Sequence, residues 1–168
     1  LILNSPSNPT GCVYSKKELE EIAQFCVSKR LFVISDEIYE KIIYDKAKHI
    51  SIASFNKEIY DLTITVNGLS KSHSMTGWRI GYLGAPADIA QAISNLQDHT
   101  TSNPSSISQK AAVAALSMPE EFAKCMCQEF EKRRNYIISR FDKMPKIEYV
   151  KPQGAFYLYF NISKTGLD

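Results

Sequence analysis

The chain has 168 residues, of which 44% are hydrophobic and 23% are charged, as is usual for a globular protein. Its formal net charge of +2 is too small to indicate nucleic acid or an anionic membrane as a partner. No apolar run is long enough to span a membrane and no signal-peptide pattern occurs, so we expect a cytoplasmic protein. The four cysteines fit no zinc-binding spacing, so we expect reduced thiols and no metal site.

The first half of the chain alternates apolar runs with turns. Residues 1–4 predict a buried strand, and the prolines and glycine of SPSNPTG predict an irregular loop after it. Ser15 and Glu18 have the spacing of a capping box, which predicts a helix start. Three further runs predict strands at 31–35, 62–66 and 79–86. Strands that alternate with helical patterns predict an α/β fold, a three-layer arrangement around a mainly parallel sheet.

The second half is mostly helical by pattern. We expect helices over 88–96 and 105–116 and a long charged helix over 119–144. The runs IEYV and AFYLYF, joined by KPQG, predict a strand pair. We therefore expect residues 1–118 to be part of a large domain and 119–168 to begin a small α+β domain. Both ends of the chain fall near apolar, strand-like runs, so we expect a piece of a longer protein.

Polar side chains follow the predicted strands. Asn8 follows the first, Asp36 and Tyr39 follow the second, Lys71 follows the third, and Arg79 begins the fourth. Ligands of open α/β sheets bind at the carboxyl ends of the strands. Pyridoxal phosphate suits this set, because its aldehyde takes a lysine amine and its protonated ring nitrogen needs a carboxylate. Its phenolic oxygen accepts hydrogen bonds, and its phosphate matches a guanidinium.

Four motifs strengthen this interpretation. GLSKSHSMTGWRIG (68–81) resembles the lysine signature of the class I/II aminotransferases, which are fold-type-I pyridoxal-phosphate enzymes. NSPSNPTG and SDEIY resemble two further signatures of that family, in the expected order, and PQGAFY resembles a fourth. SNPSSISQ with the following AAVAAL is most similar to the prokaryotic-type aspartate aminotransferase branch. The resemblance covers essentially the whole chain.

The resemblance implies a role for each matched residue. Lys71 resembles the Schiff-base lysine, which also moves a proton between Cα of the amino acid and C4′ of the cofactor. Asp36 resembles the partner of the pyridine nitrogen, and Tyr39 and Asn8 resemble donors to the ring oxygen. Arg79 resembles the phosphate-binding arginine. The Asn8–Pro9 bond is expected to be cis.

The chain also departs from the family pattern. Gly68 stands where many relatives carry a serine that binds the phosphate, so we expect that hydrogen bond to be absent, or to be supplied by Ser70 or by the part of the protein outside this chain. Asp98 stands where animal-type aspartate enzymes carry an arginine, so dicarboxylate specificity is not implied. The family forms homodimers, and Ser102 and Asn103 are candidates for residues lent to the partner's site.

We therefore expect a transaminase acting on an amino acid, with aspartate as a candidate, and a 2-oxo acid. The resemblance implies that the arm, the phosphate loop and the carboxylate-binding arginine of the relatives lie outside this chain, so we expect the 168 residues to be inactive alone. Two alternatives stay open: a C–S lyase on the same fold, and a truncated non-catalytic binding module. Tyr39 stands where lyases tend to carry histidine, which favours transamination.

Plainer interpretations of these residues exist as well. Lys71 could be a surface cation, Tyr39 a packing aromatic and Arg79 an ion-pair partner. Glu37 is expected to be an acid at a helix N-terminus, and His49 a surface or loop residue.

Overall fold

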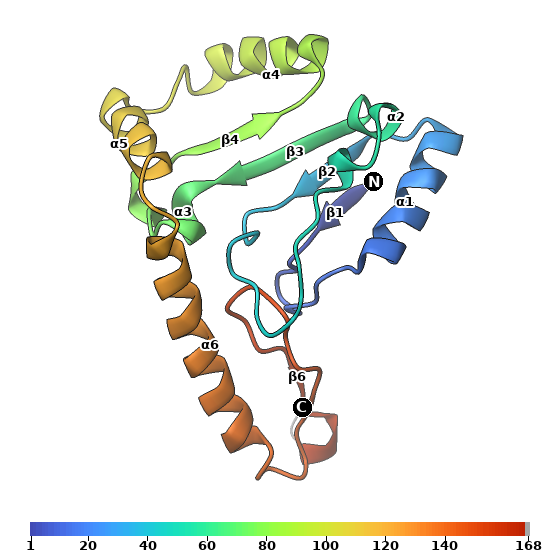
Figure 1. The fold of residues 1–168 in the computed structure, drawn as a ribbon, viewed down its shortest axis with the longest axis vertical. Helices are drawn as coiled ribbons and strands as arrows, with labels where there is room; N and C mark the ends of the chain where they lie inside the picture. Colours follow the sequence, from blue (N-terminus) through green and yellow to red (C-terminus); the bar gives the residue numbers. More distant parts are fainter. Residues whose placement is uncertain (167–168) are drawn as a thin grey trace.

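A computed structural model describes residues 1–166 of the chain. Its four-stranded sheet has the order β1 (Ile2–Asn4), β2 (Val33–Asp36), β3 (Thr63–Gly68), β4 (Gly81–Gly84). The first three strands are parallel, and β4 runs antiparallel to β3. The predicted α/β fold with a mainly parallel sheet is confirmed (Figure 1).

Helix α1 (Lys16–Lys29) connects β1 to β2 and begins at the predicted capping box, in which the Ser15 hydroxyl accepts from the Glu18 amide. Its apolar face, Leu19, Ala23 and Cys26, packs on Leu3 and Val33 of the sheet. The short elements η1 (Ile52–Ser54) and α2 (Lys57–Tyr60) complete this core through Ile52 and Ile59. This packing covers one face of the sheet, whereas Ile2 and Ile34 on neighbouring strands are 76% and 40% exposed.

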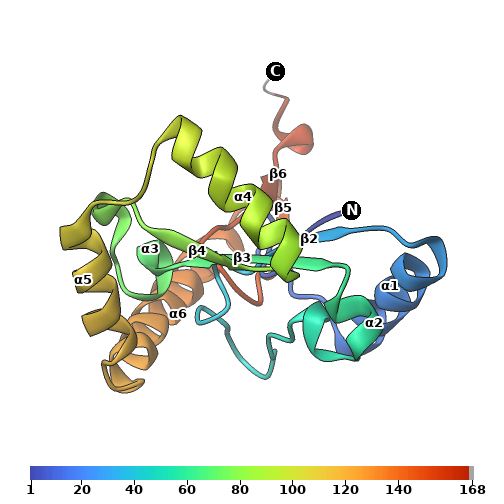
Figure 2. The same ribbon diagram turned by 90° about the horizontal axis from the view of Figure 1, so that it is seen from above.

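Two short elements follow β3 at the other end of the sheet: α3 (Leu69–Ser72) and η2 (Thr76–Trp78). Helix α4 (Ala87–Thr100) follows β4, and α5 (Ser106–Leu116) packs against Leu69 and Met75. Figure 2 shows α1 and α2 at one end of the sheet and α5 at the other. The predicted helices are therefore confirmed, with α4 extending four residues past Leu96.

The long helix α6 (Glu121–Phe141) confirms the predicted charged helix and leads away from the sheet (Figure 1). Its Cys127 and Phe130 pack on a buried cluster of Tyr39, Ile42, Tyr44 and Ala155. No helix within residues 1–166 is long and apolar enough to cross a membrane. The boundary proposed at residue 118 stays a prediction.

The predicted strand pair near the C-terminus is shorter than expected. Only β5 (Glu148–Tyr149) and β6 (Phe160–Asn161) pair, so most of AFYLYF is not strand. The reason is that Gly154 bridges to Ile43 instead, and Ala155 adopts a positive φ of 56°. The aromatic residues that follow are thereby turned toward Tyr39. The chain ends, within the described residues, in η3 (Ser163–Thr165).

Candidate active site

The site lies at one edge of the sheet, and the strand register explains why its residues meet. Asn4 of β1 is aligned with Asp36 of β2, and Asp36 is aligned with Val66 of β3. β1 and β2 therefore end at the same level, and β3 continues two residues farther, to Gly68. Because β4 is antiparallel, its first residue, Gly81, pairs with the last residue of β3, Gly68. Arg79 reaches the same edge for this reason, and not through a parallel fourth strand.

Asn4 orders the loop that carries Asn8. Its Oδ1 accepts a hydrogen bond from the Asn8 backbone amide at 2.6 Å, and its Nδ2 donates to the Asp36 carbonyl at 3.3 Å. The Asn8–Pro9 bond is cis, as expected, and so is Ser5–Pro6. The Asn8 side chain itself is exposed at this edge. Asn4 thus ties the Asn8 loop to the end of β2, a function that the sequence pattern did not single out.

Asp36 is the last residue of β2, and Tyr39 lies in the turn that follows it. The Asp36 carboxylate is half-buried, and its Oδ1 accepts from the Ile38 amide at 3.2 Å. Tyr39 is 3% exposed, and its hydroxyl oxygen lies 2.6 Å from that of Tyr157. Burial, the hydrogen bond to Tyr157 and the charges of Tyr157 and Asp36 raise the pKa of Tyr39. Tyr39 therefore stays a neutral phenol, able to donate one hydrogen bond.

Lys71 lies on α3, one turn after β3, and is half-buried. Its Nζ is 5.8 Å from the ring centroid of Tyr39 and 5.3 Å from that of Phe156. Such a position over aromatic faces holds the amine by cation–π attraction. No hydrogen bond or ion pair of the Lys71 amine is found among residues 1–166. The amine thus faces the Tyr39 side of the edge.

The two residues predicted to bind phosphate are placed differently. Ser70 is half-buried on α3 beside Lys71. Arg79 is exposed, has a positive φ of 51°, and donates from Nη1 to the Thr76 carbonyl at 2.8 Å. At Gly68, an added Cβ would lie 3.2 Å from Gly81 Cα, closer than ordinary contact. Gly68 thus suits the close approach of β4.

The residues of PQGAFY bring two side chains that sequence reasoning did not name individually. Phe156 packs edge-on against Tyr39 with 5.3 Å between ring centroids, and Tyr157 does so at 5.7 Å. The segment is held next to the Asn8 loop, because the Gln153 and Gly154 amides both donate to the Gly11 carbonyl. The motif match was the only sequence signal for them, since the contacts span more than 110 residues.

One sequence expectation at this edge is wrong. No helix follows Glu37 directly; the residue is buried, and its carboxylate accepts from Ser35 at 2.9 Å and Ser51 at 2.7 Å. His49 lies in a loop, as expected, although it is mostly buried, with its Nε2 3.0 Å from Glu37 Oε2. Glu37 is buried by these contacts with Ser35, Ser51 and His49 and does not act at a helix terminus. Glu40 lies close to this pair, and the ligand atoms of all three are within 4.8 Å of one another. The contacts with Ser35, Ser51 and His49 are sufficient to explain why the Glu37 carboxylate is buried.

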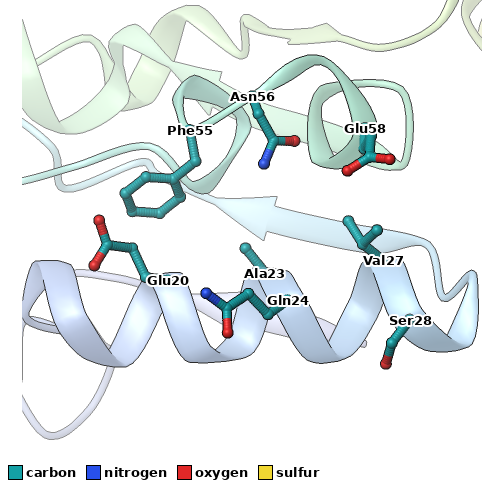
Figure 3. A pocket seen from close by; sticks show the side chains of 8 residues that line it. All are labelled: Glu20, Ala23, Gln24, Val27, Ser28, Phe55, Asn56 and Glu58. Carbon is teal, nitrogen blue, oxygen red and sulfur yellow. The ribbon is translucent and has the colours of Figure 1, made fainter.

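A groove elsewhere on the molecule is unrelated to this edge. It has a volume of about 400 Å³ and lies between α1 and the η1–α2 segment, where Glu20, Gln24, Phe55 and Asn56 line it (Figure 3). None of the predicted site residues lines it. It offers no lysine or tyrosine to a carbonyl ligand, so it does not compete as the cofactor site.

The fold and the site together define a class of protein. The family model of aminotransferase class I and II matches residues 1–166. The chain belongs to the class I and II aminotransferases.

Individual members of this family are similar to the chain along nearly its whole length. An aspartate aminotransferase of Geobacillus stearothermophilus is 51% identical over 161 residues, which are 96% of this chain and 41% of that protein. The solved structure of an aromatic aminotransferase from Pyrococcus horikoshii OT3 superimposes with a TM-score of 0.95 at 46% identity, covering 99% of this chain and 45% of that one. A PLP-bound protein from Clostridium difficile 630 matches with a TM-score of 0.90 at 29% identity, over 99% of this chain and 44% of that one. The chain thus spans about two-fifths of the curated relative's length.

Proposed function

We propose that the protein containing this chain is a pyridoxal-phosphate-dependent transaminase that moves an amino group between an amino acid and a 2-oxo acid. One observation carries the proposal: the Lys71 amine lies 5.8 Å from the Tyr39 ring centroid, at the sheet edge where β2 ends in Asp36. Family membership and the PLP-bound relative support it.

The groups at this edge fit pyridoxal phosphate. When bound, the cofactor supplies an aldehyde that takes up amino groups and a protonated ring that withdraws electrons. Lys71 would hold the cofactor through its amine, and would move a proton between Cα of the amino acid and C4′ of the cofactor. Asp36 would stabilise the charge on the ring nitrogen, since a half-buried cation is tolerated beside a carboxylate.

The remaining residues would orient the cofactor. Tyr39, kept neutral by its surroundings, would donate to the ring oxygen, together with the Asn8 amide. Arg79 and Ser70 would bind the phosphate, and the planar guanidinium suits two phosphate oxygens at once. Arg79 would then exchange its contact with the Thr76 carbonyl for the phosphate.

Aspartate is the proposed amino donor, because the relative that is 51% identical is named an aspartate aminotransferase. The aromatic aminotransferase at 46% identity makes an aromatic amino acid the alternative to test beside it. We further propose that the whole protein is a homodimer. The 168 residues alone would turn over little or nothing, since they span 41% of the curated relative.

Borohydride reduction of the cofactor-loaded protein, followed by peptide mass spectrometry, tests the proposal. We expect the reduced cofactor on Lys71, and we expect Lys71→Ala to abolish both the label and the turnover that depends on a 2-oxo acid. Lys110→Ala, at an exposed lysine of α5, is the matched control and should leave both unchanged. A label on a different lysine contradicts the proposal. Release of pyruvate and ammonia without a 2-oxo acid indicates the C–S lyase instead.

A further inference from the structure

Tyr157 forms a hydroxyl pair with Tyr39 that has no place in the roles described above. The two oxygens are 2.6 Å apart, a normal distance for one O–H···O hydrogen bond. The rings meet edge-on with 5.7 Å between centroids, so both the aromatic bodies and the polar tips are in contact. Tyr39 is 3% exposed, so a loss of its partner would leave a buried hydroxyl short of one hydrogen bond.

The backbone around Tyr157 is fixed by the segment next to Tyr39. The Ala155 amide donates to the Ile42 carbonyl at 3.0 Å, and the Tyr44 amide donates to the Gln153 carbonyl at 2.8 Å. The Tyr44 hydroxyl donates to the Ala155 carbonyl as well. In Figure 1 the C-terminal segment runs beside the loop that follows β2. These hydrogen bonds join two segments that are distant in the sequence, and they place Tyr157 next to Tyr39.

We propose that Tyr157 is a positioning residue for the reaction, which orients the Tyr39 hydroxyl and strengthens it as a hydrogen-bond donor to the cofactor's ring oxygen. This inference rests on the proposed function, because it assigns Tyr39 to that oxygen.

The number of protons on the two hydroxyls determines which tyrosine donates in the hydrogen bond between them. Each phenol has one proton to donate. When Tyr39 donates its proton to the ring oxygen, the 2.6 Å contact can be a hydrogen bond only if Tyr157 donates to Tyr39. A donor that itself accepts a hydrogen bond is polarised and donates more strongly. Tyr157 thus acts on the cofactor through the Tyr39 hydroxyl.

The consequence is a shift in the cofactor's titration. A stronger donor favours the ionised form of the ring oxygen, which lowers the pH at which the visible chromophore loses its proton. Tyr157→Phe keeps the ring packing and removes only the hydroxyl. We expect the apparent pKa of the bound chromophore to rise by about 0.5 pH unit in this variant. Tyr159→Phe, at an exposed tyrosine two residues along, is the matched control and should titrate like the unsubstituted protein.

A second measurement tests the pair without the cofactor. In protein labelled with ¹³Cζ-tyrosine and freed of cofactor, the Tyr39 resonance, assigned with Tyr39→Phe, should move at neutral pH in Tyr157→Phe and stay in Tyr159→Phe. An unmoved resonance overturns the inference and leaves the proposed function intact. A moved resonance with an unchanged chromophore pKa also overturns the inference, because the loss of the Tyr157 hydroxyl then affects Tyr39 but not the cofactor. If the unsubstituted protein carries no cofactor on Lys71, the proposed function fails and the inference fails with it.

Discussion

Arg134 of α6 binds Asp45 through two parallel hydrogen bonds, from Nη1 to Oδ2 at 2.9 Å and from Nη2 to Oδ1 at 3.1 Å. Nη1 also donates to the buried Pro152 carbonyl at 3.0 Å, and the guanidinium carbon lies 4.6 Å from the centre of the Tyr44 ring. The Arg134 side chain is only 4% exposed. One buried charge therefore joins α6, the segment after β2 and the segment that leads to Tyr157.

Replacing this arginine should destabilise the protein strongly. Arg134→Met fills similar space but leaves the Pro152 carbonyl buried without its donor and Asp45 without its main partner. We expect the free energy of unfolding to fall by about 2–4 kcal/mol, measured by urea denaturation. The matched control is Arg133→Met, because Arg133 is exposed and forms a surface ion pair with Glu129 on the same helix. That change should cost at most about 0.5 kcal/mol. Equal losses of unfolding free energy in the two variants would contradict the stabilising role of the buried Arg134.

Gly154 is required by close packing. A Cβ at this position would lie 2.7 Å from Pro6 Cβ and 3.0 Å from the Ile42 carbonyl oxygen. Gly154→Ala should therefore force the loop after β1 away from the segment that carries Tyr157, and lower the free energy of unfolding by about 1–3 kcal/mol. Thermal or urea unfolding measures this. Gly84→Ala is the control, since a Cβ there meets nothing within 4 Å, and a similar loss in that variant would refute the packing argument.

Much of the fold and the site could be predicted, because the signals are local. Apolar runs mark β1 to β3, and the candidate polar residues Asn8, Asp36 and Lys71 lie at the end of a strand or in the segment that follows it. The direction of β4 could not be predicted, because its short run GYLG is compatible with either orientation.

Long-range contacts explain what the sequence missed. Ser35 and Glu37 are buried, whereas Ile34, which precedes them on β2, is 40% exposed, and this reverses the usual hydrophobic pattern. Glu37 is buried because Ser51 and His49 reach it from a later loop. Tyr157 likewise meets Tyr39 from 118 residues away, so no local pattern could place it.

Glu37 should make stability depend on pH. Burial raises the pKa of Glu37, but the hydrogen bonds from His49, Ser51 and Ser35 and the charge of His49 outweigh it, and the net pKa lies below the ordinary value of 4.5. The folded protein then binds this proton less tightly than the unfolded chain does. The stabilisation is present above about pH 4.5 and is lost as the pH falls through the folded-state pKa.

The variant that tests this is Glu37→Gln. It should lower the free energy of unfolding by about 1–3 kcal/mol at neutral pH. It should also lose less stability than the unsubstituted protein between pH 5 and pH 3, a window of about two units around the carboxyl titration. Glu58→Gln, at an exposed carboxylate of α2, should leave the pH dependence unchanged. Parallel curves for the unsubstituted protein and Glu37→Gln would show that Glu37 is not the titrating group.

Asp36→Asn isolates the charge proposed to hold the cofactor's ring nitrogen. The asparagine keeps an oxygen that can accept from the Ile38 amide, at 3.2 Å in the present structure, so the turn after β2 should be retained. Without the negative charge, the ring nitrogen is less readily protonated and withdraws electrons less effectively. We expect kcat to fall by about 10²- to 10³-fold at saturating cofactor, the range found when one preorganised electrostatic contact is removed.

The control is Asp61→Asn, since Asp61 is exposed and pairs with Lys57 on the surface, and its kcat should stay within about twofold. Unfolding midpoints measured on both variants separate a catalytic loss from a folding defect. If Asp36→Asn keeps kcat within about threefold of the unsubstituted enzyme, the carboxylate does not hold the ring nitrogen and its place at the sheet edge is structural.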